Sequence, residues 1–149
     1  MTSFAEALKK GLDVHKRAAE ARNEMDEVLA AASKEVSEVL QGEISFRFQA
    51  VDRPARVQSS RELLAGVPAP REQSQALTAR SQHSAPSVLA EVGFGELGYP
   101  VTLRWESEFR MADDRDGFET VIKDLLAHGA TGAKLGALLK STSTPGVAR

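Results

Sequence analysis

At 149 residues, with no Cys and a formal net charge of −2, the chain can bury a core of its own but cannot form disulfides, use thiol catalysis or bind zinc through Cys. A net charge this small does not by itself indicate a nucleic-acid-binding protein. No apolar run reaches the roughly 20 residues that span a bilayer, and the N-terminal residues lack a signal-peptide pattern, so we expect a cytoplasmic protein without a membrane segment.

The first predicted element is a long helix that fills the N-terminal segment, residues 1–42. Ser3 and Glu6 form a capping-box pattern, and Gly42 stands where the C-terminal cap of a helix is expected. An unbroken helix of this kind is about 55–60 Å long at ~1.5 Å per residue, which is more than a small domain covers. Either the helix breaks near Gly11, or part of it projects and packs on something else.

An apolar stripe on this helix is a candidate surface for self-association. Four of its residues follow the heptad-like alternation of four and three positions: Met25, Leu29, Ala32 and Val36. Helix faces rich in Ala permit close approach of another element. The stripe therefore packs on the sheet of the same chain, joins copies into a homo-oligomer such as a dimer, or does both.

Alternation of apolar and polar residues with a period of two predicts an antiparallel sheet of about four strands. The predicted strands cover residues 43–51, 87–94, 99–105 and 109–112. The last three are close enough in sequence to form a meander. Aligning Phe94 with Tyr99 brings the apolar residues of the first of these hairpins onto one face, whereas a shift by one residue would scatter them.

The predicted register of the last hairpin places two arginines side by side. If Trp105 pairs with Phe109, Arg104 lies directly opposite Arg110 on the polar face. Like charges in this position repel unless an acidic neighbour or a ligand lies between them. Because Arg47 of the first strand also points to a polar face, we predict that these three arginines receive a carboxylate or phosphate of a partner. The alternative is that acidic residues of the same sheet neutralise them.

Residues 52–86 lose the alternation and are interpreted as a long insertion in the sheet. The segment is rich in Ser, Gln and Pro, and Pro70 can begin a short helix that reaches Leu77. Insertions of this length are usually functional loops or disordered segments. Three of its arginines are further candidates for partner binding: Arg53, Arg56 and Arg61.

Two helices are predicted after the sheet, over residues 114–128 and 131–140, followed by a flexible tail at 141–149. Asp113 or Asp114 caps the first helix, and its apolar residues recur at helical spacing, so that it can cover the apolar face of the sheet. The predicted fold class is therefore α+β. Residues 1–42 form a helical segment, and residues 43–140 form an α+β domain.

Two motifs resemble ligand sites but lack the context that those sites need. Residues 93–98 match the Gly-x-Gly-x-x-Gly pattern, yet a strand rather than a helix follows them, so we interpret the glycines as turn residues. Residues 113–117 lack the final Glu of a calcium loop. The three His residues are scattered without ligand spacing. We therefore predict no catalytic residue, no metal and no cofactor.

These observations favour a non-catalytic binding or assembly protein with a protein partner. Accessory proteins of phages and mobile elements, including inhibitors of host defence systems, share this kind of architecture, which is an analogy only. One alternative is a nucleic-acid-binding protein that uses the Arg-bearing segment 52–86, although Glu62 and Glu72 accompany the arginines and aromatic residues are absent from it. The other alternative is a protein that binds a small ligand such as a nucleotide in a pocket beside the sheet.

Overall fold

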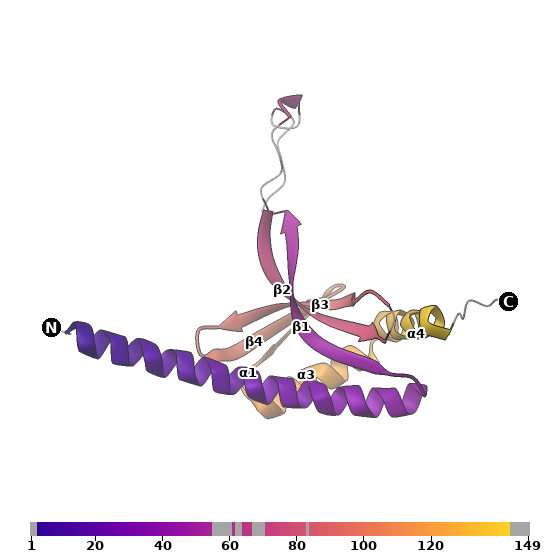
Figure 1. Cartoon of the computed structure of the whole chain (residues 1–149), viewed down its shortest axis with the longest axis horizontal. Coiled ribbons are helices and arrows are strands. Elements are labelled where there is room, and N and C mark those ends of the chain that lie inside the picture. Colours follow the sequence, from indigo (N-terminus) through magenta and orange to yellow (C-terminus); the bar gives the residue numbers. More distant parts are fainter. Residues whose placement is uncertain (1–2, 55–60, 62–63, 67–70, 83, 144–149) are drawn as a thin grey trace.

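The computed structural model describes residues 3–54, 61, 64–66, 71–82 and 84–143. The elements follow in the order α1 (Phe4–Leu40), β1 (Ile44–Pro54), β2 (Arg71–Ser81), β3 (Ser87–Gly95), β4 (Gly98–Trp105), β5 (Glu108–Ala112), α3 (Arg115–Ala127) and α4 (Gly129–Ser143) (Figure 1). The strands form one antiparallel five-stranded sheet in the order β1-β2-β3-β4-β5. The predicted α+β fold class is confirmed, with one strand more than the four that the alternation indicated.

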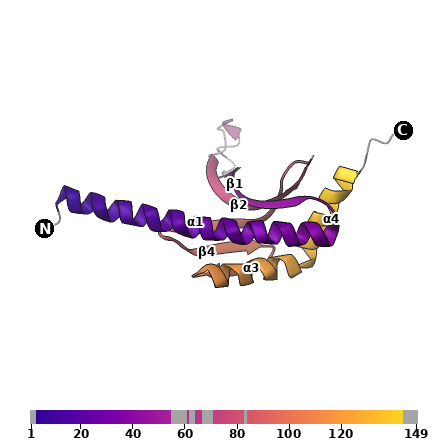
Figure 2. The same cartoon turned by 60° about the horizontal axis from the view of Figure 1, so that its bottom comes forward.

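Helix α1 is continuous through Gly11, so of the two alternatives the break does not occur. Its N-terminus carries the predicted capping box: Ser3 Oγ accepts the N–H of Glu6 at 3.2 Å, and Glu6 Oε2 accepts the N–H of Ser3 at 3.4 Å. The C-terminal part of α1 lies along the sheet, whereas its N-terminal part extends beyond the sheet (Figures 1 and 2). The C-terminal part of this helix therefore belongs to the body of the molecule, and the N-terminal part projects from it.

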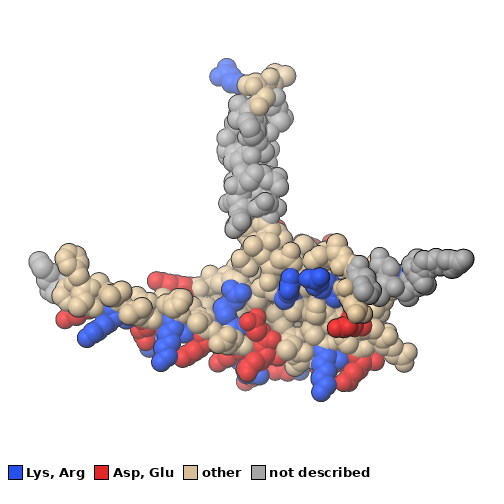
Figure 3. Space-filling model, in the orientation of Figure 1, with Lys and Arg blue, Asp and Glu red and all other residues tan. Residues whose placement is uncertain are grey.

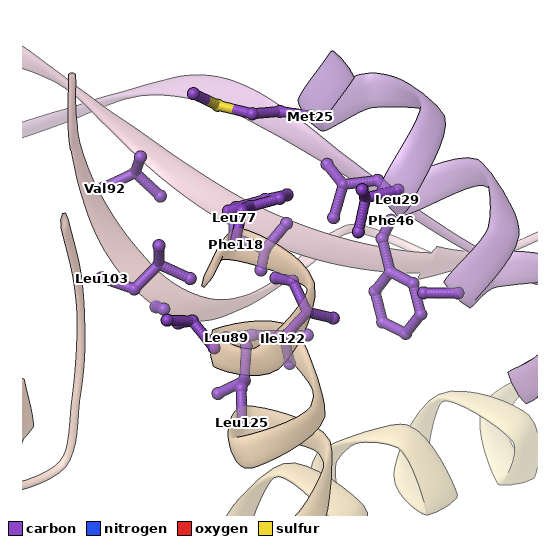
Figure 4. Close-up of a cluster of buried hydrophobic side chains, with 14 of the residues drawn as sticks. Met25, Leu29, Phe46, Leu77, Leu89, Val92, Leu103, Phe118, Ile122 and Leu125 are labelled. Atoms are coloured by element: carbon purple, nitrogen blue, oxygen red, sulfur yellow. The ribbon is translucent and has the colours of Figure 1, made fainter. Parts of the chain in front are cut away.

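The core lies between one face of the sheet and the helices. Phe118 is fully buried at its centre, where side chains from α1, α3 and the strands converge (Figure 4). Large side chains of this core come from both layers, among them Met25, Leu29, Phe46, Leu77, Leu103, Trp105, Ile122 and Leu125. Each layer thus removes the apolar face of the other from water, which is the main stabilising term of such a fold.

The predicted oligomerisation stripe is part of this core. Met25, Leu29 and Ala32 are 0%, 2% and 9% exposed, and Val36 packs half-buried against them. The first three have little surface left for a second copy, because the sheet of the same chain covers them. The stripe therefore packs on the sheet of its own chain, and self-association through it stays a prediction for which Val36 keeps exposed surface.

Strand β2 lies inside the segment that was predicted to be an insertion. It pairs with β1 along its whole length, from Ile44 opposite Ser81 to Pro54 opposite Arg71. The short helix predicted to reach Leu77 is therefore wrong, since Leu77 is a strand residue that faces the core. Where β1 and β2 leave the sheet they continue as a two-stranded ribbon that projects from the body (Figure 1).

The hairpins of the meander are tighter than predicted. Phe94 lies opposite Val101 rather than Tyr99, with an irregularity in the pairing between Phe94 and Gly95. This shift of two residues keeps Val92 and Phe94 on the predicted face, whereas Val88, which lies opposite Thr78 beyond an irregularity in the β2–β3 pairing, is 44% exposed. Trp105, however, lies opposite Glu108, one residue earlier than predicted.

Candidate binding surfaces

One face of the sheet is turned away from the helices, and we call it the open face. Its residues are identified by their cross-strand neighbours, which share a face, and they are Arg47, Arg80, Glu91, Arg104, Phe109 and Met111. Thr78 lies opposite Arg47 on the same face but is 1% exposed, because neighbouring side chains cover it. Phe109 and Met111 are 49% and 56% exposed. The open face therefore combines basic side chains with exposed apolar ones.

The arginines of the open face are not neutralised by salt bridges. Within the described part of the chain, Arg47, Arg80 and Arg104 take part in no ion pair. The guanidinium of Arg104 lies 5.5 Å from the centroid of the Phe109 ring, which is a cation–π distance. Most of the Asp and Glu side chains in the view of Figure 3 lie along the helices instead.

Arg110 does not belong to the open face, which corrects the predicted pairing of Arg104 with Arg110. Because the β4–β5 loop is one residue shorter than predicted, Arg104 lies opposite Phe109 and Arg110 lies opposite Leu103 on the helix side. Arg110 Nη1 donates to Glu108 Oε2 at 2.9 Å, and its Nε lies 3.8 Å from a carboxylate oxygen of Asp124. Its charge is thus balanced within the chain.

The arginines predicted from segment 52–86 add little to this surface. Arg53 lies in β1 opposite Glu72, but its side chain lies outside the described residues, as does Arg56 altogether. Arg61 is described and exposed. Of the six arginines predicted to bind a partner, the structure places Arg47 and Arg104 together on one face and separates Arg110 from them.

A second candidate site lies between α1 and the edge strand β1, and we call it the edge groove. Its volume is about 570 Å³, and residues of both elements line it: Arg22, Asp26, Leu29, Ala30, Ser33, Ser45, Phe46, Arg47 and Phe48. Arg22 was not predicted as a site residue, because a charged residue on a helix is usually solvated. The sequence held one indication of its position: helical spacing places Arg22 on the same face of the helix as Ser33 and Ser37. The structure shows that this face lies beside β1, because both serines bond to β1.

A third hollow, of about 380 Å³, lies between α1, α3 and α4. Apolar side chains such as Val28, Val36 and Leu126 line it, together with charged ones such as Glu35 and Lys123. Val39 is 80% exposed beside it. The shape and lining suit an apolar side chain or small ligand.

Among the titratable groups of the described residues, Tyr99 is the one whose pKa is clearly shifted by its environment. Burial, followed by the hydrogen bond that its hydroxyl donates to Glu24 Oε1 at 3.1 Å, raises the pKa of Tyr99 from 10.0 to about 12. A phenol with this pKa stays protonated near neutral pH and is a poor general base there. We therefore assign Tyr99 a structural role between α1 and β4.

Three further observations bear on the class of protein. Among the described residues, no group of three or more His, Asp or Glu side chains is placed to hold a metal ion. The helices of the described chain all lack the length or the apolar character of a membrane span. Comparison with protein-family models, with curated proteins and with solved structures finds no match for this chain.

Proposed function

We propose that this chain is a non-catalytic binding protein that recognises a protein partner through the open face of its sheet. The supporting observation is that the helices cover one face only, while the other combines Arg47, Arg80 and Arg104 with the exposed Phe109 and Met111. Arg, Met and aromatic residues are enriched in protein interfaces, where they supply most of the binding energy. The partner that fits this face has acidic groups around an apolar centre.

A second candidate function is the binding of single-stranded nucleic acid by the same face. The observation that favours it is the stacking of Arg104 over an exposed Phe109 ring, since bases stack on such rings and phosphates pair with such arginines. Glu91, directly across from Arg104, repels a phosphate and a partner carboxylate alike, so it does not separate the two candidate functions. The analogy with phage accessory proteins stays a prediction from architecture.

We also propose that copies of the chain associate through the projecting end of α1. Phe4, Leu8 and Leu12 are 98%, 63% and 58% exposed and recur every four residues, so they form one apolar stripe. A helical segment of this length is marginal in water without a packing partner. Contact between two such stripes removes both from water and stabilises the projecting turns.

The open-face proposal is tested by affinity purification of partners from the cells in which the chain occurs. The variant Arg104→Glu combined with Phe109→Ser is expected to lose its partner, because both the charge and the apolar contact are removed. Lys34→Glu makes the same charge change at an exposed site on α1 and is the matched control. Partners that bind the double variant as well as they bind the natural chain would contradict the proposal.

Nuclease treatment separates the two candidate functions. A protein partner that remains after nuclease treatment and depends on Arg104 supports the first function. A mobility shift of labelled single-stranded DNA or RNA that depends on Arg104 and weakens steeply with salt supports the second.

A further inference from the structure

Helix α1 covers the free edge of β1 along only part of its length. Ser37 Oγ accepts the N–H of Ile44 at 2.9 Å and donates to the carbonyl of the same residue at 3.0 Å. Ser33 Oγ accepts the N–H of Phe46 at 2.9 Å. These bonds identify the even-numbered residues of β1 as those whose backbone groups point away from β2, since alternate residues of an edge strand bond to the neighbouring strand.

The next two outward positions of β1 are Phe48 and Ala50, and the helix does not cover them. Within the described part of the chain, no helix side chain bonds to their backbone groups. The residue that follows Ser37 and Ser33 on the same helix face is Ala30, whose methyl group cannot accept a hydrogen bond. The edge is therefore covered at Ile44 and Phe46 and open from Phe48 onwards.

Arg22 places an unneutralised positive charge in the groove beside this open edge. Its guanidinium carbon lies 4.2 Å from the centroid of the Phe94 ring and 5.0 Å from that of Phe48, so the two rings hold it in position. Arg22 Nε is buried without a hydrogen-bond partner, and the described residues offer the side chain no ion pair. Arg47 also lines the groove, and Asp26 is the acidic residue among the lining side chains.

We propose that the edge groove binds an extended acidic segment of a partner protein, which pairs with β1 from Phe48 outwards and places a carboxylate against Arg22. A groove between a helix and an open strand edge is the geometry in which peptides add as an extra strand, with backbone hydrogen bonds giving affinity and side-chain pockets giving specificity. A carboxylate supplies the ion pair that the described residues do not offer the Arg22 guanidinium. The groove shares Arg47 with the open face, but the two features that carry this proposal, the charge of Arg22 and the strand edge at Phe48, do not belong to the open face.

The test is a selection of random twelve-residue peptides, displayed on phage, against the full chain. Ala50→Pro removes an N–H that points outward and takes no part in the ladder with β2, and proline is tolerated at such edge positions. Ala50→Val keeps this N–H and is its matched control. Arg22→Gln removes the charge, and Lys34→Gln removes a charge elsewhere on α1.

We expect the selected peptides to be enriched in Asp and Glu and to bind the natural chain, Ala50→Val and Lys34→Gln with similar affinity. Binding to Ala50→Pro and to Arg22→Gln is expected to be at least about tenfold weaker, the effect of one lost charge-assisted or backbone hydrogen bond. Fluorescence of Trp105, the single Trp of the chain, shows whether each variant is folded.

A second measurement keeps the proposal testable if Ala50→Pro does not fold. Methylation of alternate backbone nitrogens of a selected peptide removes its strand donors, and methylation of the intervening nitrogens does not. One of the two series should lose binding about tenfold while the other keeps it. A selection that yields no acidic peptide, peptides insensitive to Arg22→Gln, or equal effects of the two methylation series would overturn the proposal.

Discussion

Gly98 in the hairpin between β3 and β4 lies so close to Ala21 of α1 that a Cβ added to Gly98 would overlap the Ala21 Cβ. The added carbon would also lie 3.3 Å from the carbonyl oxygen of Ala18, and Gly98 has a φ of +90°, which side chains disfavour. We expect Gly98→Ala to lower the free energy of unfolding by about 2–4 kcal/mol, from overpacking and backbone strain together. Urea denaturation followed by Trp105 fluorescence measures this change.

The matched control for this substitution is Gly132→Ala in α4. A Cβ at Gly132 meets no atom within 4 Å, and its backbone is helical. Alanine is expected to raise the free energy of unfolding there by about 0.5–1 kcal/mol, because it restricts the unfolded chain and suits a helix better. Equal losses in the two variants would mean that the contact with Ala21 is not the cause.

Ser37 and Ser33 attach the edge of the sheet to α1. Ser37→Ala leaves the N–H and carbonyl of the buried Ile44 without their partner, so we expect a loss of about 1–3 kcal/mol in the free energy of unfolding. Ser45→Ala, on the exposed side of β1, should change it by less than about 0.5 kcal/mol. Chemical denaturation of the three chains compares these values, and indistinguishable midpoints would show that α1 holds β1 by apolar packing alone.

The elements that sequence patterns predicted well are those fixed by near neighbours. The capping box at Ser3 begins α1 where expected, and Asp114 Oδ1 accepts the N–H of Gly117 at 2.7 Å at the start of α3. Both contacts join residues three positions apart. Local chemistry of this kind does not depend on how the rest of the chain folds.

Strand β2 was missed because its neighbours, rather than its own pattern, make it a strand. Ala76, Leu77, Thr78 and Ala79 are all at most 1% exposed, so both faces are buried and no alternation marks them. The register of β4 and β5 was missed for a related reason. Glu106 takes a φ of 52° in the two-residue loop, where turn rules expect Gly or Asn.

The candidate sites were only partly predictable. Arg47 and Arg104 could be assigned to a polar face from the alternation alone, which is correct. Arg110 could not, because a loop shorter by one residue turns its side chain to the opposite face. Arg22 is a candidate site residue because of its contacts with Phe48 and Phe94. These two residues are distant from it in sequence and become its neighbours only in the folded chain.

Self-association through α1 is expected to depend on its projecting end and not on its buried stripe. Leu8→Glu combined with Leu12→Glu should lower the molar mass in solution to that of one chain, because charges cannot be buried between two stripes. Its thermal midpoint, extrapolated to low concentration, should match that of the natural chain, since both residues lie outside the core. Lys9→Glu is the exposed control on the same helix. Light scattering measures the mass, and a natural chain that is monomeric at high concentration would refute the proposal.

Tyr99 makes the stability of the fold sensitive to alkaline pH. It is the only Tyr of the chain, so the absorbance of tyrosinate reports on it alone. Its pKa is about 12 when folded, against 10.0 as the ordinary value, because of burial and the hydrogen bond to Glu24. Between pH 10 and about 12 the folded chain therefore holds a proton that the unfolded chain releases. The contribution of Tyr99 to stability is complete below pH 10 and is lost as the pH rises to about 12.

Two variants test this assignment. Tyr99→Phe should abolish that part of the fall in stability between pH 10 and about 12 that depends on the phenol. Glu24→Gln removes the negative charge beside the hydroxyl and should shift the titration midpoint of Tyr99 downwards. A midpoint near 10 in the folded natural chain would show that the hydroxyl is solvated and that its bond to Glu24 does not persist in solution.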